Sequence, residues 1–389
     1  MTLRLDNRWS GVMLALVSTV ATLAVVGTAA EFSLRYRERH RPTVPGTMPL
    51  VYYRHGRLGY ALVRNADYFG WVHVNREGFR GPDVLPDKSP GVVRIMVVGS
   101  STTFDSFVTR DSAAWPARLQ FWLKDLAPTQ QFEVINVGVP GYGVIDHLIR
   151  LETDLYRYHP DVIILYETHN DLFGGLRRSN EGPPLQTNTP DEIRPVTPWM
   201  YWLGRHSLLY TKLVERWNVM RFARLKPRGA AAGVATAGPA ESDIAAAARQ
   251  FERDVTGFVV VARALGIRVV LLEVVQVSGV GTLQESDSTV RATWRHVVPF
   301  ARPEIVLQGY DRYGTVLRRV AAKLSLQFIP TSQFGLKGSS YYAEADPIHF
   351  NDRGADRMGH EVARALLAVH VLDLQPNAES GRQSQRPMR

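Results

Sequence analysis

The sequence predicts an α/β fold in which a mostly parallel, five-stranded sheet lies between layers of helices. From Val92 onward, short apolar stretches rich in β-branched residues alternate with longer segments of helical periodicity. Strands separated by helices are joined by crossovers, which make neighbouring strands parallel and place helices on both faces of the sheet. A third observation, an uncharged run near the N-terminus, predicts a transmembrane helix ahead of this fold.

The elements of this fold follow one another along the chain. The predicted strands cover residues 92–98, 132–137, 161–166, 268–275 and 326–329. The predicted helices cover residues 112–126, 146–158, 245–265, 309–324 and 354–367. The first strand is almost entirely apolar, as expected of a strand that is buried on both faces.

Other stretches lie outside this pattern. Residues 43–91 form a turn-rich lead-in segment, and the fold itself is expected to cover 92–370. Residues 174–242 interrupt it. Their first part, 174–225, is predicted to be a lid or helical insertion that borders the active site, and their Ala/Gly-rich end, from Arg228 to Ser242, a flexible loop. Residues 371–389 are polar and are predicted to be disordered.

Gly11–Ala30 is a run of 20 residues without a charge, which is the length that a helix needs to cross a bilayer. Thr28-Ala29-Ala30 has the small residues of a signal-peptide cleavage site. However, the run exceeds the usual apolar core of a signal peptide, so an uncleaved signal anchor is favoured. Residues 1–42 are therefore interpreted as a cytoplasmic stub, a transmembrane anchor and a basic linker.

The net charge of +9 is scattered, and its densest cluster follows the apolar run. This cluster consists of Arg35, Arg37, Arg39 and Arg41. A position beside a membrane explains it better than nucleic-acid binding, for which no recognisable motif is present. The positive-inside rule alone would favour a cytoplasmic domain. Because Glu31 and Glu38 dilute the cluster, we instead expect a single-pass membrane protein with a periplasmic or extracellular domain.

The chain contains no cysteine, which excludes disulfides, thiolate zinc sites and a cysteine nucleophile. Asp346 and His349 are possible metal ligands, but no third ligand accompanies them at a recognisable spacing. No metal or other cofactor is predicted.

Polar residues directly after the strands are the best candidates for functional residues, because open α/β sheets place their sites beyond the carboxyl ends of the strands. Gly99-Ser100-Ser101 follows the first strand, where Ser101 is a candidate nucleophile or an ordinary helix cap. The loop of residues 138–143 follows the second strand, and its three glycines can present backbone N–H groups or simply form a turn.

Thr168-His169-Asn170-Asp171 follows the third strand. The Asn170 amide is a candidate oxyanion donor, with helix capping by Asn170 or Asp171 as the alternative. A surface position is expected for His169, and positions on a helix or at its end for His147 and His159.

Asp346-Pro347-Ile348-His349 precedes the last predicted helix. A serine hydroxyl needs a base to remove its proton, and histidine is suited to this near neutral pH. An aspartate three residues earlier can hold the imidazole in the required tautomer. The order of the four segments is therefore more informative than any one of them.

In that order, the four segments resemble blocks I, II, III and V of the SGNH (GDSL-like) hydrolase superfamily over residues 92–368. The resemblance implies a flavodoxin-like, three-layer α/β/α fold with Ser101 as nucleophile and Asp346 and His349 as its acid–base partners. It also implies an oxyanion hole formed by Ser101, Gly141 and Asn170. Residues 75–81 resemble the lead-in of membrane-anchored members. The Gly-x-Ser-x-Gly motif of α/β-hydrolases is absent at Ser101.

Two positions depart from the family pattern: Ser100 replaces an aspartate and Thr168 replaces a glycine. Neither position supplies triad or oxyanion chemistry, although both can reshape the site and Thr168 can narrow it. We expect a serine esterase that acts on an envelope substrate such as an O-acetylated polysaccharide or a lipid ester. The alternatives are an O-acyltransferase with the same triad and a non-catalytic envelope scaffold.

Overall fold

The computed structural model describes residues 7–40, 52–68, 71–181, 198–224, 241–277, 301–344 and 346–372. The chain divides into two compact units. We call residues 52–194 and 232–389 the sheet unit, and residues 1–51 and 195–231 the helical unit.

The sheet unit contains five parallel strands, which confirms the predicted sheet. In spatial order these are β6 (Gln131–Asn136), β5 (Val92–Gly99), β7 (Val162–Tyr166), β8 (Arg268–Leu272) and β9 (Gln327–Ile329). Strand β8 ends three residues before its predicted end. Its last residue, Leu272, pairs with Ile329, where β9 also ends.

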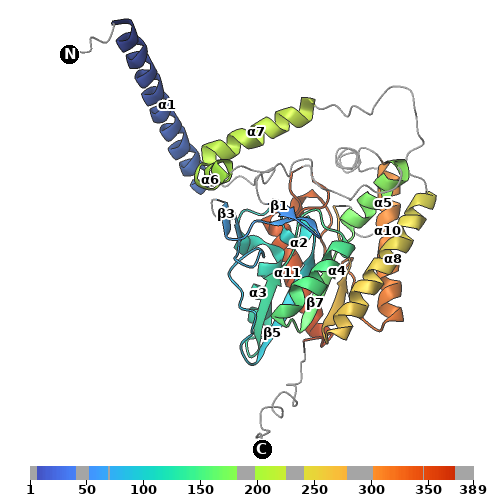
Figure 1. The fold of residues 1–389 in the computed structure, drawn as a ribbon. Coiled ribbons are helices and arrows are strands. Elements are labelled where there is room, and N and C mark those ends of the chain that lie inside the picture. The colour runs from blue at the N-terminus through green and yellow to red at the C-terminus, as the bar shows by residue number, and fades with distance from the viewer. Residues whose placement is uncertain are drawn as a thin grey trace, which may run out of the picture. The chain divides into compact units, whose positions relative to one another are not determined.

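Helices cover both faces of this sheet, as predicted (Figure 1). Helices α3 (Trp115–Leu126) and α11 (Asp352–Ala368) pack together on one face. The other face carries α4 (Val144–Thr153), α8 (Glu241–Ala264) and α10 (Pro303–Lys323), with α5 (His169–Glu181) packed against α8. The predicted helix 146–158 is two elements, α4 and the 3₁₀ helix η2 (Leu155–Tyr158). Helix α10 begins six residues before its predicted start, at a proline whose fixed φ suits a first helical turn.

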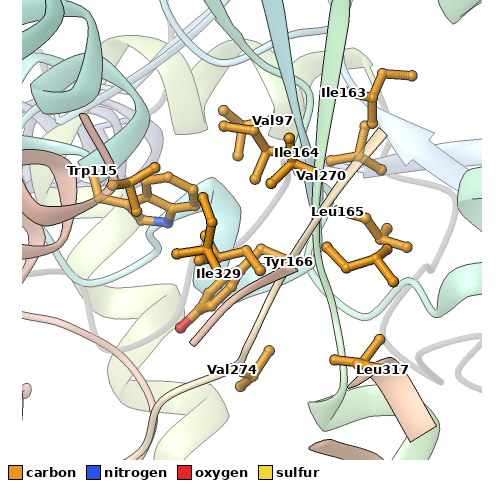
Figure 2. Packing of buried hydrophobic residues seen from close by; sticks show 14 of the residues in the cluster. Val97, Trp115, Ile163, Ile164, Leu165, Tyr166, Val270, Val274, Leu317 and Ile329 are labelled. Carbon is orange, nitrogen blue, oxygen red and sulfur yellow. The ribbon is translucent and has the colours of Figure 1, made fainter. Parts of the chain in front are cut away.

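The core lies where the strands meet these helices (Figure 2). Val97, Ile164 and Val270 on neighbouring strands are fully buried, and their β-branched side chains suit a sheet covered on both faces. Trp115 packs edge-on against Tyr166, with ring centroids 5.5 Å apart. This contact fixes α3 against the carboxyl end of β7.

The lead-in segment forms two antiparallel hairpins, which the sequence analysis did not predict. Strand β1 (Tyr52–His55) pairs with β2 (Gly59–Leu62), and β3 (Ala66–Tyr68) pairs with β4 (Val72–Val74). Strands of three or four residues are too short to show a clear alternation of apolar and polar positions.

The helical unit contains α1 (Asn7–His40), α6 (Pro198–His206) and α7 (Leu208–Arg224). Within α1, Gly11–Arg37 is long and apolar enough to cross a membrane. Helices α6 and α7 lie within the segment 174–225 that was predicted to be a lid or a helical insertion. The placement of 174–225 beside the active site stays a prediction. Most of the predicted flexible loop and the polar tail beyond residue 372 lie outside the described residues.

Candidate active site

Ser101 is the first residue of the short helix α2 (Ser101–Phe104), directly after β5. A Cβ atom at Gly99 would lie 2.2 Å from the carbonyl oxygen of Tyr166, so only glycine allows β5 to pass β7 this closely. The N–H groups of Thr103 and Phe104 donate to the Ser100 carbonyl at 3.0 and 2.8 Å. The resulting turn holds Ser101 at the carboxyl edge of the sheet.

The loop before α11 brings two further predicted residues to Ser101. Asp346 Oδ1 accepts hydrogen bonds from the N–H groups of Ile348 and His349, both at 2.8 Å. Its second oxygen, Oδ2, lies 2.8 Å from His349 Nδ1. The other ring nitrogen, Nε2, lies 2.9 Å from Ser101 Oγ. One carboxylate therefore fixes both the turn and the imidazole, and the ring of Phe107 packs against that imidazole at 4.7 Å.

The electrostatics of Asp346 suit this arrangement. Burial raises the pKa of its carboxyl group, but the opposing effects of His349 and of three hydrogen bonds are larger together, so the pKa of Asp346 lies below its usual value. Asp346 is therefore a carboxylate at neutral pH and accepts a hydrogen bond from Nδ1–H. The tautomer with a proton on Nδ1 leaves Nε2 free to accept the hydroxyl proton of Ser101.

The two other residues of the predicted oxyanion hole also lie near each other. Asn170 is in the first turn of α5, and its Nδ2 donates to the carbonyl of Tyr142 at 2.8 Å. That carbonyl belongs to the residue after Gly141. The same loop packs directly on the turn of Ser101, because a Cβ atom at Gly138 would lie 2.3 Å from the backbone nitrogen of Phe104. The structure thus brings the loops after β5, β6 and β7 together.

The two departures from the family pattern are both buried. Ser100 has an exposed fraction of 0% and Thr168 of 2%. The Thr168 hydroxyl donates to the carbonyl of Glu167, so it is directed at its own backbone. Both side chains are thus part of the interior around the site.

His169 is buried as well, with an exposed fraction of 1%, so the predicted surface position is wrong. Its Nδ1 pairs with the hydroxyl of Tyr310 on α10. Burial, with a smaller effect of the nearby His349, lowers the pKa of His169 to about 3, so its ring is neutral at neutral pH. The predicted helical position of His147 is correct, because it lies on α4.

Two acids near the nucleophile, the buried Glu167 and the half-buried Asp171, were not singled out from the sequence as functional residues. Glu167 Oε1 accepts hydrogen bonds from the N–H groups of Thr168 and Asn170, at 2.9 and 3.3 Å, and thereby fixes the start of α5. Burial raises the pKa of Glu167 to about 8. Asp171 was considered as a cap of its own helix. Instead, its Oδ2 accepts the N–H of Val144 at 3.1 Å, at the start of α4.

Tyr60 of the lead-in contacts the loop that contains Gly141. Its hydroxyl donates to the carbonyl of Pro140 at 2.7 Å, and its ring packs edge-on against Tyr142 at 5.1 Å. In return, the hydroxyl of Tyr142 donates to the carbonyl of Tyr60. The lead-in therefore holds the loop that contributes to the predicted oxyanion hole.

Arg80 makes the corresponding contact with the nucleophile turn. Its guanidinium donates to the carbonyls of Phe104 and Asp105, both at 2.7 Å, and pairs with Asp111 at 2.7 Å. The side chain is almost completely buried. Neither Tyr60 nor Arg80 was predicted as a site residue, because each contacts a segment distant in sequence and no local pattern marks such a contact.

Within the part of the chain that the structure describes, no group of three or more His, Asp or Glu side chains is arranged to hold a metal ion.

Comparisons with known proteins agree with the order of these segments. Residues 97–357, well over half of the chain, match the GDSL-like Lipase/Acylhydrolase family. A comparison with curated proteins found no match.

Several solved structures are similar to this chain. An acetylxylan esterase from Geobacillus stearothermophilus is 14% identical with a TM-score of 0.39, over 72% of this chain and 94% of that one. An α/β hydrolase enzyme from the metagenome of Lake Arreo, Spain, is 14% identical with a TM-score of 0.41, over 72% of this chain and 95% of that one. A structure titled TesA is 18% identical with a TM-score of 0.40, over 71% of this chain and 99% of that one.

Proposed function

Because the chain belongs to the GDSL-like lipase/acylhydrolase family, we propose that it hydrolyses esters through an acyl-serine intermediate on Ser101. The observation that carries this proposal is the hydrogen-bonded series Ser101–His349–Asp346, with distances of 2.9 and 2.8 Å. A nucleophile, a base within hydrogen-bond reach and a carboxylate that orients the base are the parts that acyl transfer requires.

In the first half of the reaction, Ser101 Oγ attacks the ester carbonyl carbon while His349 Nε2 takes the hydroxyl proton. The tetrahedral intermediate then collapses, and His349 gives the proton to the departing alcohol as the carbon–oxygen bond breaks. In the second half, water attacks the acyl-serine, again with His349 as base, and releases the acid and Ser101. Throughout, Asp346 stabilises the imidazolium as a carboxylate.

The negative charge of the tetrahedral intermediate needs donors that are already in place. The N–H groups of Ser101 and Gly141 and the side chain of Asn170 are proposed for this role. One proton on Asn170 Nδ2 is used for the carbonyl of Tyr142 at 2.8 Å, which orients the amide, and the second is left for the substrate oxygen. The contact therefore positions a donor before the substrate arrives.

The proposed substrate is an O-acyl group of an envelope polysaccharide or a lipid ester. This follows from α1, which we propose is an uncleaved anchor that holds the remaining chain on the periplasmic or outer side of a membrane. An alkaline phosphatase fused to the C-terminus should then be active, and a cytoplasmic reporter at the same position should be silent. The reverse pattern would place the sheet unit in the cytoplasm.

A fluorophosphonate probe tests the nucleophile directly, because it reacts covalently with an activated serine. The full chain in detergent should be labelled, and Ser101→Ala should lose all labelling. Ser112→Ala is the control, since it removes a hydroxyl from an exposed serine and should leave labelling intact. Labelling of Ser101→Ala at the original level would refute the proposal.

The same experiment separates the alternative functions. An unlabelled but folded wild-type chain would favour the non-catalytic scaffold. If the chain is labelled, adding a sugar hydroxyl acceptor to an activated ester distinguishes transfer from hydrolysis, because an acyltransferase forms a new ester where an esterase releases the acid.

A further inference from the structure

The last part of α1 is joined to the insertion by a set of hydrogen bonds within the helical unit. The Glu31 carboxylate accepts the N–H groups of Leu208 and Leu209 at 2.9 and 2.8 Å, and the hydroxyl of Ser207 at 3.0 Å. The first N–H groups of a helix have no partner within it, so Glu31 caps the start of α7.

Arg35 completes this junction one turn further along α1. Its Nε pairs with Glu31 at 2.6 Å, and its guanidinium donates to the carbonyl of His206 at 2.8 Å. His206 is the last residue of α6, where carbonyl groups lack helical partners. One acid and one base on α1 therefore satisfy the adjoining ends of α6 and α7. Figure 1 shows both helices meeting the end of α1.

The position of this junction along α1 indicates its depth in a bilayer, if α1 is the anchor proposed above. Glu31 directly follows the uncharged run Gly11–Ala30. At about 1.5 Å per residue, that run is about 30 Å long, which matches the hydrocarbon core of a bilayer. The junction, and with it the start of α7, thus lies where the hydrocarbon ends and the headgroups begin.

Helices α6 and α7 present large apolar side chains to solvent. Trp199 and Trp202, three residues apart on α6, are 60% and 58% exposed. Leu213 and Trp217, four residues apart on α7, are 60% and 65% exposed. Such spacings place each pair on one face of its helix. Tryptophan is enriched at the membrane–water interface, where its amphipathic ring lies among the headgroups.

The charge of this hairpin also suits an anionic membrane. Residues 198–224 contain five basic side chains and one acidic side chain, a net charge of +4. These are Arg205, Lys212, Arg216, Arg221 and Arg224 against Glu215. Basic segments next to a membrane anchor gain affinity for anionic headgroups.

From these observations we propose that the α6–α7 hairpin lies in the interfacial layer of an anionic bilayer, beside the point where α1 leaves it. The insertion then supplies a second membrane contact, held to the anchor by Glu31 and Arg35. The proposal depends on α1 being a membrane anchor, which is part of the proposed function.

The absence of cysteine from the chain allows a direct test, since any introduced cysteine carries a unique nitroxide label. Leu213→Cys and Trp202→Cys report on the hairpin, and Val20→Cys reports on the middle of the apolar run. Val260→Cys on α8 and Leu126→Cys on α3 are aqueous references, because these exposed positions lie on helices that cover opposite faces of the sheet. The full chain is reconstituted in vesicles of phosphatidylcholine and phosphatidylglycerol, and collisions with oxygen and with a water-soluble nickel chelate are compared.

The oxygen-to-nickel ratio should be highest at Val20, intermediate at Leu213 and Trp202, and lowest at the aqueous references. If Val20 has a high ratio while Leu213 and Trp202 match the references, the hairpin proposal is wrong although the anchor stands. A low ratio at Val20 would instead refute the anchor, and with it the membrane location in the proposed function.

Two further comparisons test whether Glu31 and anionic lipid are responsible for the membrane contact of the hairpin. Glu31→Ala should lower the ratio at Leu213 toward the aqueous references and leave Val20 unchanged. Glu38→Ala, which removes the same charge from the same helix, should leave both ratios unchanged; equal effects of the two variants would contradict the role given to the junction. Vesicles of phosphatidylcholine alone should give a lower ratio at Leu213, and an unchanged ratio would refute the preference for anionic lipid.

Discussion

The two ends of the parallel sheet use buried polar groups in opposite ways. At the amino end, Arg94 on β5 is almost completely buried, and its side chain bonds to Glu133 and to the carbonyls of Pro86 and Tyr158. Its backbone N–H donates to Asp161 at 2.8 Å. The charged group at this end is thus surrounded by acceptors, as stable protein interiors require.

At the carboxyl end, several buried polar atoms have no hydrogen-bond partner among the described residues. They include His147 Nδ1 and His169 Nε2, while His147 Nε2 and Glu167 Oε2 face each other at 3.8 Å, beyond hydrogen-bond distance. These residues lie directly after β7 or on α4 and α5. Natural proteins depart from full satisfaction of polar groups mainly at functional sites. The comparison indicates that the buried polar groups at the amino end stabilise the fold, whereas those at the carboxyl end are retained for function.

The largest expected effect is a loss of kcat when the catalytic residues proposed at the carboxyl end of the sheet are replaced. Ser101→Ala and His349→Ala should each lower kcat by at least about a thousandfold, and the double variant should be little worse, because the two residues act as one unit. Asp346→Ala should be milder, since water can partly orient the imidazole. Hydrolysis of a p-nitrophenyl ester by the full chain measures this. Losses that multiply in the double variant would show that the residues act independently.

The next largest effect is expected at the amino end of the sheet, where a substitution should lower stability and leave kcat unchanged. Arg94→Met removes the partner of a carboxylate and of two carbonyls, which should lower the free energy of unfolding by about 3 kcal/mol. The kcat of the folded protein should not change. Thermal unfolding measures the loss, and Arg157→Met, at an exposed arginine, should change stability by less than about 0.5 kcal/mol. A large loss of kcat in folded Arg94→Met would contradict the division between the two ends.

A smaller effect tests the role proposed for Asn170 at the carboxyl end of the sheet. Asn170→Ala should lower kcat on the order of a hundredfold, which is the usual consequence of losing one oxyanion donor. The melting temperature should change little, because the amide is only partly buried and water can replace it at the Tyr142 carbonyl. Steady-state kinetics distinguish the alternatives, since a change in KM with an unchanged kcat would mean that Asn170 only binds substrate.

The smallest effect concerns pH. Burial lowers the pKa of both His147 and His169 from 6.5 to about 3. Between these values the unfolded chain binds protons that the folded chain does not, so stability falls as the pH drops below 6.5. Each histidine can contribute up to about 1.4 kcal/mol per pH unit.

His147→Gln should therefore reduce the loss of melting temperature between pH 7 and pH 5, whatever its effect at pH 7. His73→Gln is the control for removal of an imidazole, at a partly exposed position. An undiminished dependence in His147→Gln would mean that this histidine is not kept neutral by the fold.

The parts of the fold that were predictable are those with periodic apolar patterns. The run from Val92 to Val98 marked β5, and the turn residues after each strand pointed to the edge where Ser101 lies. The five predicted site residues lie in four short segments whose order along the chain carried the prediction, and the family resemblance assigned Gly141 its role in the oxyanion hole. Their catalytic roles stay a proposal.

The parts that were missed depend on contacts between distant segments. Tyr60 and Pro140 are 80 residues apart, and Arg80 and Phe104 are 24 apart, so no local pattern joins them. His169 was expected at the surface because nothing near it in the sequence shows that Tyr310 on α10 covers it. The three- and four-residue strands of the lead-in are too short for periodicity to reveal.

The contacts of Tyr60 and Arg80 determine where the chain can be cut. A fragment trimmed to the family match would begin at Val97 and would retain Ser101, Asp346 and His349. It would nevertheless lose the supports of the loop before Tyr142 and of the turn after β5. Such a fragment would be inactive because it lacks the contacts of Tyr60 and Arg80, although it retains Ser101, Asp346 and His349. Expression boundaries should therefore be drawn upstream of Tyr52, so that both hairpins accompany the sheet.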